Sequence, residues 1–212
     1  MDLEQLTEKV KELEAKLQLQ TDIEQIKKLQ REYGYQLYGY YFDSRMKDEV
    51  INLFSDNAES LEVSDHGVFL GKEGIRRFFQ AEGEPRPKGK LALILQLQGV
   101  VDVNPDGKTA KGRWTGIMIM NITQKGKHQP CLGLGTYENE YIKEDGGWKF
   151  KKLHWNIIFR STLKNGWVKE PDVTHVPYEE LKVRGDLPPT AYNPYPSGYF
   201  VPLHWIKSEK KD

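Results

Sequence analysis

"PCLGLGTYENEYIKEDGGWKFKKLHWNIIFR", residues 130–160, holds two long apolar and aromatic stretches joined by the tetrapeptide EDGG at 144–147. Asp-Gly and Gly-Gly pairs tolerate the positive backbone angles of a tight hairpin turn. The flanking stretches are rich in the aromatic and β-branched residues that favour strands. This stretch therefore predicts two long antiparallel strands joined by a hairpin.

A second hairpin precedes the first one. The stretches GKLALILQLQGVVDV (89–103) and TAKGRWTGIMIMNIT (109–123) flank another turn signal, NPDG at 104–107. Helical patterns fill the chain before these strands. Helices followed by a run of long antiparallel strands predict an α+β fold, with the helices on one face of a curved sheet.

The helical part opens with a heptad repeat. Its a and d positions are apolar and are separated by Lys and Glu: Leu3, Leu6, Val10, Leu13 and Leu17. Little more than two heptads make a marginal helix in isolation, so we expect this helix to pack against something. A monomer would leave this apolar stripe partly exposed to solvent. We therefore expect a homodimer or homotrimer with this helix in or near the contact.

Thr21 and Glu24 follow the heptads with the spacing of a capping box, which predicts that a new helix begins there. Asp43 is expected in the loop after this helix. Shorter helices are expected at 46–54 and 71–80, with a short strand near 59–63. The apolar face of the helix before the loop recurs every three or four residues, at Ile26, Leu29, Tyr33, Leu37 and Tyr40.

The end of the chain is rich in proline, since seven of the eleven prolines lie beyond Glu170. Proline at this density opposes both helix and sheet. The segment also carries Tyr192, Tyr195, Tyr199, Phe200 and Trp205, which are too many aromatic residues for a solvated tail. We expect an ordered arm that closes a cavity or buttresses an adjacent chain. The expected division is a helical extension (1–20), an α+β domain (21–168) and the arm (169–212).

Composition excludes several classes of function. Lysine plus arginine equal aspartate plus glutamate at 31 each, so a nucleic acid or an anionic membrane is not an expected partner. The chain lacks both an apolar run of about 20 residues and the apolar core of a secretion signal. Its single cysteine, Cys131, precludes an internal disulfide, and a reducing cytoplasm is the simplest location. The five histidines lack metal-ligand spacing, so no metal is expected.

The order and spacing of several phrases resemble the SnoaL-like branch of the nuclear transport factor 2-like superfamily. These phrases are DIEQIKKLQREYGY, YYFDSRMKDEVINLFSDNAESLEV, GVFLGKEGIRRFF, DGKTAKGRW and YENEYIKEDGGWKFKKLHW, between about residues 20 and 165. The resemblance implies a cone: a bent antiparallel sheet wrapped on about three helices, with a deep apolar pocket. Members such as ketosteroid isomerase, scytalone dehydratase, bile-acid 7α-dehydratase and lignin diarylpropane lyases mostly act without a cofactor on hydrophobic ring compounds.

The family's functional positions fall on mixed residue types in this chain. By resemblance to the bile-acid dehydratase, its catalytic tyrosine matches Tyr33 and its catalytic aspartate matches Asp43. The positions of its histidine, its second acid and its arginine fall on Ile94, Met118 and Ile157. The resemblance therefore implies a pocket in which three polar positions have become apolar.

Three residues are candidates for the chemistry. Asp43 could act as a base if burial raises its pKa, or it could merely cap the next helix. Tyr33 could donate a hydrogen bond to an oxyanion, or to a backbone carbonyl as a core tyrosine. His154 faces away from the pocket if odd-numbered residues line it, unless a β-bulge reverses the strand. Glu138 and Glu140 are expected to form cross-strand salt bridges with Lys151 or Lys152.

The sequence predicts a lyase or isomerase without a cofactor, acting by proton abstraction on an aromatic or polycyclic small molecule. Dehydratase and formaldehyde-lyase eliminations both fit. The alternative is a binding or assembly protein that uses the same pocket. Two or more converging ionisable side chains would favour the enzyme, and a wholly apolar cavity would favour the binder. The expected substrate contacts are Leu37, Tyr40, Ile94, Met118, Trp155 and Ile157.

Overall fold

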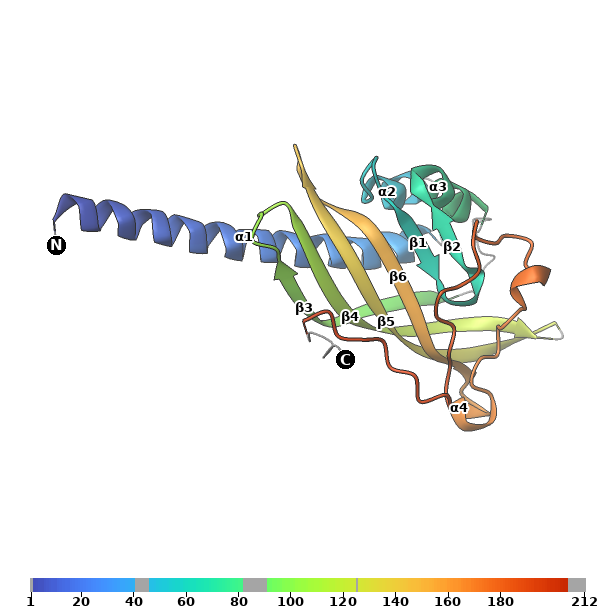
Figure 1. Ribbon diagram of the computed structural model, residues 1–212. Helices are drawn as coiled ribbons and strands as arrows, with labels where there is room; N and C mark the ends of the chain where they lie inside the picture. The colour runs from blue at the N-terminus through green and yellow to red at the C-terminus, as the bar shows by residue number, and fades with distance from the viewer. Residues whose placement is uncertain (1, 41–45, 82–90, 125, 206–212) are drawn as a thin grey trace, which may run out of the picture.

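The structure is a computed structural model that describes residues 2–40, 46–81, 91–124 and 126–205 (Figure 1). Helices come first and long strands follow, as the sequence predicts. The elements, in chain order, are α1 (Leu3–Tyr40), α2 (Met46–Asn52), β1 (Ser60–Val63), the 3-10 turn η1 (Ser64–His66), β2 (Val68–Leu70), α3 (Gly71–Ala81), β3 (Ala92–Val103), β4 (Thr109–Gln124), β5 (Lys127–Glu144), β6 (Gly147–Thr162), α4 (Gly166–Lys169) and the 3-10 turn η2 (Tyr178–Glu180).

The strands form one curved sheet in the order β2-β1-β6-β5-β4-β3. Both predicted hairpins are present, at the β3–β4 and β5–β6 connections. One pairing departs from the antiparallel sheet that was expected, because β1 runs parallel to β6. Strand β1 can reach β6 in this direction because the helices and the whole β3–β5 meander separate the two in sequence.

Helix α1 is continuous through the point where a new helix was expected to begin. The capping-box prediction at Thr21 is wrong, because the hydroxyl of Thr21 donates a hydrogen bond to the carbonyl of Leu17, one turn back within the same helix. Residues 2–21 of the chain are exposed. Burial begins at Asp22, which accepts hydrogen bonds from Lys143 and Trp148 at 2.6 and 2.9 Å.

The second half of α1 forms the helical side of the core. Its buried apolar residues are those predicted to face inward: Ile26, Leu29, Tyr33 and Leu37. Gln30 is fully buried among them and links the helix to the sheet. Its side-chain oxygen accepts hydrogen bonds from Asn139 and Tyr141, and its amide donates one to Gln96. These bonds fix α1 across the sheet because a buried amide is costly to leave unpaired.

A β-bulge interrupts the pairing of β5 with β6. Gly135 pairs with Ile157, whereas the next residue back, Leu134, pairs with Phe159. Ile158 is therefore an extra residue in β6. An extra residue changes which face of the sheet the following side chains occupy. This change of face decides which residues of β6 reach the site.

Beyond α4 the chain continues as an arm, residues 170–205, that lies against the edge and the outer face of the sheet (Figure 1). Leu187 forms an antiparallel bridge with Val68 of β2. Farther along, Thr190 donates hydrogen bonds to Glu62, and the guanidinium of Arg113 donates one to the carbonyl of Val201. The arm therefore extends the sheet at β2 and then crosses the face opposite α1.

Every helix in the described ranges is too short or too polar to cross a membrane.

Candidate functional site

A cavity of about 220 Å³ lies between α1, α3 and the concave side of the sheet. Most of its wall is apolar, and the polar residues on it are Tyr33, His66, Arg160 and Thr174. The apolar part of the wall consists of Leu37, Val63, Phe78, Ala92, Ile94, Met118, Met120 and Trp155. An apolar pocket with a few polar groups is the usual form of a small-molecule site.

Several residues singled out in the sequence line this cavity. They are Tyr33 and Leu37 from α1, Ile94 from β3, Met118 from β4 and Trp155 from β6. The aromatic ring of Tyr33 is held in edge-on contacts with Phe54, Tyr137 and Phe150 at centroid distances of 5.4–6.5 Å. Asp43 and the side chain of Tyr40 lie outside the described residues.

Two other predicted site residues do not line the cavity. Ile157 is fully buried, but it is not part of the cavity wall. His154 lies on the opposite face of β6 from Trp155, with its Nε2 3.6 Å from Glu62. The bulge at Ile158 comes after His154, so it does not turn this side chain inward. Burial lowers the pKa of His154, and the nearby charge of Glu62 opposes that shift only in part.

One polar group on the wall is a histidine that the sequence interpretation did not select, His66. Asp65 and His66 stand on the turn between β1 and β2, where the ring Nδ1 of His66 lies 3.3 Å from Oδ1 of Asp65. Ser64 begins this turn at φ 44°, a backbone region that a non-glycine residue rarely adopts, and Gly67 ends it at φ 86°. Such strain in a short turn is a common mark of a functional position.

Gly67 also brings the arm close to this turn. A Cβ atom at position 67 would lie 2.3 Å from the carbonyl oxygen of Leu187 and 2.7 Å from the ring of Tyr178. The carbonyl of His66 itself accepts a hydrogen bond from the backbone N–H of Gly185 at 2.8 Å. The arm therefore supports the backbone that presents His66.

A buried ion-pair network holds the carboxylate of Asp65. The guanidinium of Arg160 donates a hydrogen bond to Asp65 at 3.0 Å and two hydrogen bonds to Asp172 at 2.8 Å. Burial alone would raise the pKa of Asp65, but the hydrogen bond with His66 and the charge of Arg160 outweigh it and hold that pKa far below its usual range. Asp65 therefore remains a carboxylate beside the imidazole ring.

Arg160 reaches the cavity because of the bulge. Trp155 and Arg160 both line the cavity although they are five positions apart, which a regular strand would place on opposite faces. The sequence comparison assigned the family's arginine position to Ile157. In the structure Ile157 is not on the cavity wall, and the arginine on that wall is Arg160, three residues later.

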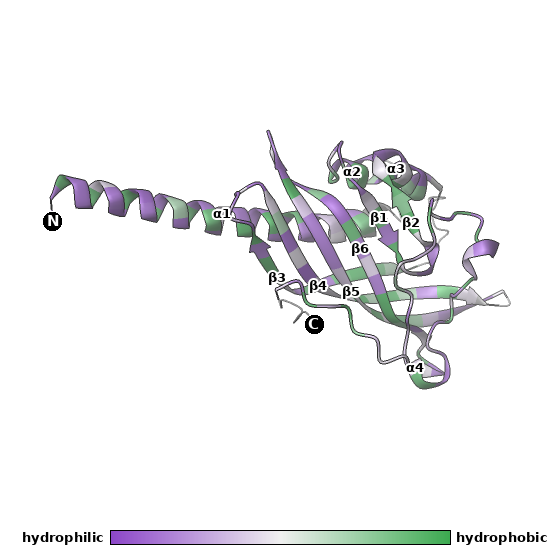
Figure 2. Ribbon diagram, in the orientation of Figure 1, coloured by the Kyte–Doolittle hydropathy of each residue, from purple (hydrophilic) through white to green (hydrophobic). Residues whose placement is uncertain are grey.

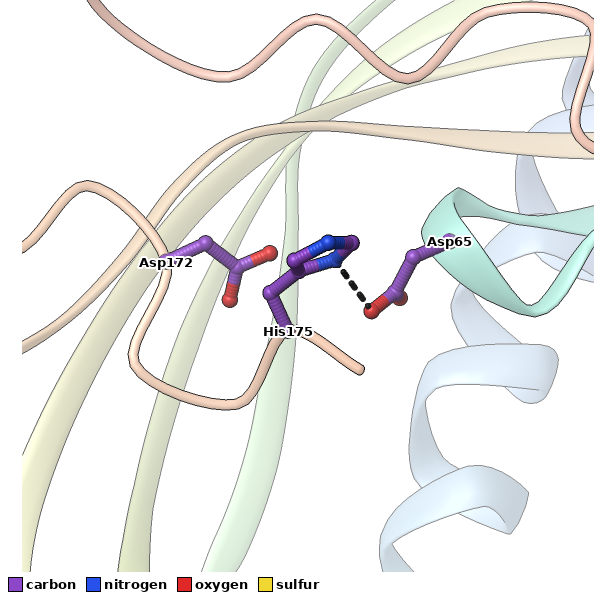
Figure 3. A group of neighbouring side chains, drawn as sticks. All are labelled: Asp65, Asp172 and His175. Carbon is purple, nitrogen blue, oxygen red and sulfur yellow. Dashed lines mark hydrogen bonds and ion pairs between the residues drawn. The ribbon is translucent and has the colours of Figure 1, made fainter. Parts of the chain in front are cut away.

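The arm supplies the remaining polar groups at this end of the cavity. Figure 3 shows Asp172 and His175 from the arm and Asp65 from the turn converging, with His175 Nδ1 3.3 Å from Asp65 Oδ2. The hydroxyl of Tyr192 donates a hydrogen bond to Asp172 at 2.6 Å, and the ring of Tyr192 stacks on that of His175. Thr174 completes the cavity wall.

Asp65, Asp172 and His175 place potential metal-ligand atoms within 4.8 Å of one another. The two carboxylates already face the fixed positive charge of Arg160, which is buried. A divalent cation at this point would have to compete with that guanidinium. The geometry therefore fits a network that orients side chains better than it fits a metal site.

The two glutamates that were expected in salt bridges lie on the outer face of the sheet. Glu138 pairs with Arg113 and His204, and Glu140 lies 3.6 Å from Lys152. Burial raises the pKa of Glu138, although Arg113 and His204 partly oppose the shift. These carboxylates attach the arm and the strands to one another rather than serving the cavity.

Comparison with solved structures places the fold. A "Putative Scytalone Dehydratase" from Novosphingobium aromaticivorans superposes with a TM-score of 0.56 at 14% identity, covering 75% of this chain and 97% of that one. The hexachlorocyclohexane dehydrochlorinase LinA-type3 from Novosphingobium barchaimii gives a TM-score of 0.55 at 18% identity, over 70% of this chain and 94% of that one. A type 2 hexachlorocyclohexane dehydrochlorinase (LinA) gives a TM-score of 0.56 at 18% identity, over 70% of this chain and 93% of that one.

At these identities the likeness establishes the fold, which this chain shares with proteins named as a dehydratase and as dehydrochlorinases. No curated protein matches the sequence. The family model described as "SnoaL-like domain" matches residues 20–154. The match includes the second half of α1, the short strands β1 and β2, the strands β3, β4 and β5, and the first half of β6. Since that match spans well over half of the chain, the protein belongs to the SnoaL-like domain family.

Proposed function

We propose that this protein is a lyase or isomerase that needs no cofactor and removes a proton from a hydrophobic ring compound bound in the cavity. The observation that carries the proposal is the Asp65–His66 pair at the wall of an otherwise apolar pocket. Two further polar groups, Tyr33 and Arg160, converge on the same space. A purely binding pocket has no need of an imidazole oriented by a buried carboxylate.

His66 is the proposed general base. With Nδ1 donating its hydrogen to Asp65, Nε2 is the nitrogen that accepts the substrate's proton. Asp65 fixes the tautomer and stabilises the imidazolium that forms. The guanidinium of Arg160 keeps Asp65 ionised and in place. Arg160 is thus a positioning residue in this scheme.

Tyr33 is the proposed hydrogen-bond donor to the oxygen that gains charge as the proton leaves. Its ring is locked by three aromatic neighbours, so little reorganisation is needed during the reaction. The apolar wall excludes water and strengthens each of these electrostatic interactions. Abstraction of a carbon-bound proton leads to elimination of water where a neighbouring hydroxyl leaves, or to an isomerisation where the proton returns at another carbon. Loss of formaldehyde uses the same base on the O–H of a hydroxymethyl group: the C–C bond to that group breaks, and its electron pair expels a neighbouring hydroxyl.

The size and lining of the cavity support an aromatic or polycyclic substrate. Ile94, Met118 and Trp155 present flat or flexible apolar surface, as ring compounds require.

The protein is also proposed to work in a reducing cytoplasm. Burial raises the pKa of its single thiol, Cys131, to about 11, so this cysteine is an inert core residue.

The runner-up is a binding protein that uses the same cavity. Apolar residues at Ile94 and Met118, where the family resemblance implies polar ones, support this alternative. The two functions differ in whether a proton is exchanged. A binder would hold its ligand without exchanging any carbon-bound proton.

The test is hydrogen–deuterium exchange at carbon. The full chain is first examined by native mass spectrometry for a co-purified ligand, and a panel of hydroxylated ring compounds is then incubated with it in D₂O. We expect deuterium uptake or elimination with the wild-type protein and none with His66→Gln. His154→Gln is the matched control, since it changes the same residue type on the other face of the sheet. Exchange that persists in His66→Gln but is lost in Asp43→Asn would transfer the role of base to Asp43.

A further inference from the structure

The first half of α1 projects away from the rest of the molecule (Figure 1). Hydrophobic residues recur along this half, as Figure 2 shows. The side chains of the stripe are between 45% and 79% exposed: Leu3, Leu6, Val10, Leu13 and Leu17. The described part of the chain therefore leaves this heptad seam exposed.

We propose that this seam binds a second copy of the same chain and forms a parallel two-stranded coiled coil. Leu3, Val10 and Leu17 stand at heptad position a, and Leu6 and Leu13 stand at d. β-branched residues at a with Leu at d favour two strands, and the central layers of this seam, Val10 and Leu13, follow that pattern. Isoleucine at d, which favours larger assemblies, does not occur in the seam.

The charges beside the seam set the direction of the two helices. Lys9 stands at g and Glu14 at e. In a parallel pair each g residue faces an e residue five positions later in the partner, so Lys9 faces the partner's Glu14, and the symmetric pair forms as well. In an antiparallel pair g faces g, and Lys9 would face Lys16 of the partner subunit. This repulsive lysine–lysine contact would occur twice, once on each side of the symmetric dimer.

The short length of the seam is compensated by the rest of the helix. Residues 3–20 span only about 27 Å at 1.5 Å per residue. An isolated helix of this length would be marginal, because nucleation is costly. Here the second half of α1 is already folded against the sheet through Ile26, Gln30 and Tyr33, so association does not have to nucleate the helix.

The consequence for architecture is specific. In a parallel coiled coil both cavities lie beyond the same end of the coil. Each α1 helix carries the seam in its N-terminal half and the cavity residues Tyr33 and Leu37 in its C-terminal half. The two sites remain separate, since the seam ends at Leu17, before burial begins at Asp22. The proposal is therefore independent of the proposed chemistry.

The first measurement is sedimentation equilibrium on the full chain and two matched variants. Leu13→Glu introduces a carboxylate into a d layer of the seam. Leu19→Glu makes the same change at a leucine of similar exposure, 42% against 55%, which lies off the seam at position c. We expect a wild-type dimer, a Kd at least about 100-fold higher for Leu13→Glu because two carboxylates would be buried together, and little change for Leu19→Glu.

The second measurement fixes the direction. In the parallel coil Lys9→Glu faces the partner's Glu14 and should raise the Kd about tenfold, and the double variant Lys9→Glu, Glu14→Lys should restore it. In an antiparallel coil Lys9→Glu would face Lys16 of the partner subunit and tighten the dimer. Leu13→Cys should also cross-link with its own copy under mild oxidation, whereas Leu19→Cys should not; buried Cys131 does not compete.

A monomeric wild type, a trimeric mass, tighter association of Lys9→Glu, or failure of Leu13→Cys to cross-link would each overturn the proposal. Circular dichroism checks that each variant keeps its helix, so loss of association is not confused with unfolding. None of these outcomes depends on whether the chain is an enzyme.

Discussion

Two histidine–carboxylate pairs lie near one another in this protein, on opposite faces of the sheet. Asp65 and His66 stand on the turn after β1, where the ring lines the cavity. Glu62 of β1 and His154 of β6 lie side by side on the outer face, and Thr190 of the arm donates hydrogen bonds to Glu62. The residue types are the same, but the surroundings differ.

That difference shows why residue type alone does not identify a base. His154 is partly buried, its pKa is lowered by that burial, and within the described residues its Nε2 makes no hydrogen bond. His154 is not on the wall of the cavity that Tyr33 and Trp155 line. His66 faces a space that a small molecule can occupy, beside a carboxylate that Arg160 keeps charged. The inner pair is therefore the proposed catalytic pair, whereas Glu62 of the outer pair holds the arm through Thr190.

The largest expected effect is on the inner pair. His66→Gln should lower turnover of any substrate by about 10²–10⁴, because it removes the proposed base. The melting temperature should stay within a few degrees, since the ring is partly exposed. Steady-state kinetics and thermal unfolding measure the two effects.

His154→Gln is the paired control and should retain nearly wild-type turnover. Equal losses of turnover in the two variants would erase the functional difference between the pairs.

The fold was largely predictable because its signals are local. The hairpin turns at 104–107 and 144–147 and the inward face of α1 at Ile26, Leu29, Tyr33 and Leu37 follow from short-range pattern. The break expected at Thr21 was not real. A threonine can equally bond back to the preceding turn, and packing of the following residues keeps the helix continuous.

The site was less predictable because it depends on two non-local features. A single extra residue at Ile158 brings Arg160 into the cavity, and periodicity alone does not reveal a bulge. Asp172 meets Asp65 only because the arm folds back from more than 100 positions along the chain. One usable signal was present: an acidic residue, a histidine and a glycine in a tight connection between two short strands, "SDHG" at 64–67.

The next effect concerns the charge that supports the inner pair. Arg160→Gln leaves Asp65 and Asp172 buried without a cation, which should lower the free energy of unfolding by about 3–5 kcal/mol. Urea denaturation measures it. Adding Asp172→Asn to Arg160→Gln should recover part of the loss, because one unpaired charge is then removed. If the losses in unfolding free energy of Arg160→Gln and Asp172→Asn simply added in the double variant, the two residues would not be energetically coupled, which would contradict the network.

A smaller effect is expected on the outer face. Thr190→Val keeps the side-chain shape but removes a hydroxyl that lies 2.9 Å from both carboxylate oxygens of Glu62. The free energy of unfolding should fall by about 1.5–3 kcal/mol, the range for a hydrogen bond to a charged group. Amide hydrogen exchange near residue 190 should become faster while turnover changes little. A large loss of turnover with intact stability would mean that the outer pair also serves the reaction.

The smallest effect is a pH dependence that belongs to the outer pair. Burial holds the pKa of His154 below its unfolded value of about 6.5, because the folded chain favours the neutral ring; Glu62 beside it weakens this effect without reversing it. In the pH range between the lowered folded pKa and about 6.5, the unfolded chain binds a proton that the folded chain does not. Stability is therefore complete above that range and falls as the pH falls through it, by at most about 1.4 kcal/mol per pH unit for one proton. Urea denaturation of the wild type and of His154→Gln from pH 7.5 to 5 measures the slope, which should be shallower in the variant. An unchanged slope would show that another group is responsible, and a wild type that gains stability on acidification would show that the ion pair with Glu62 outweighs burial.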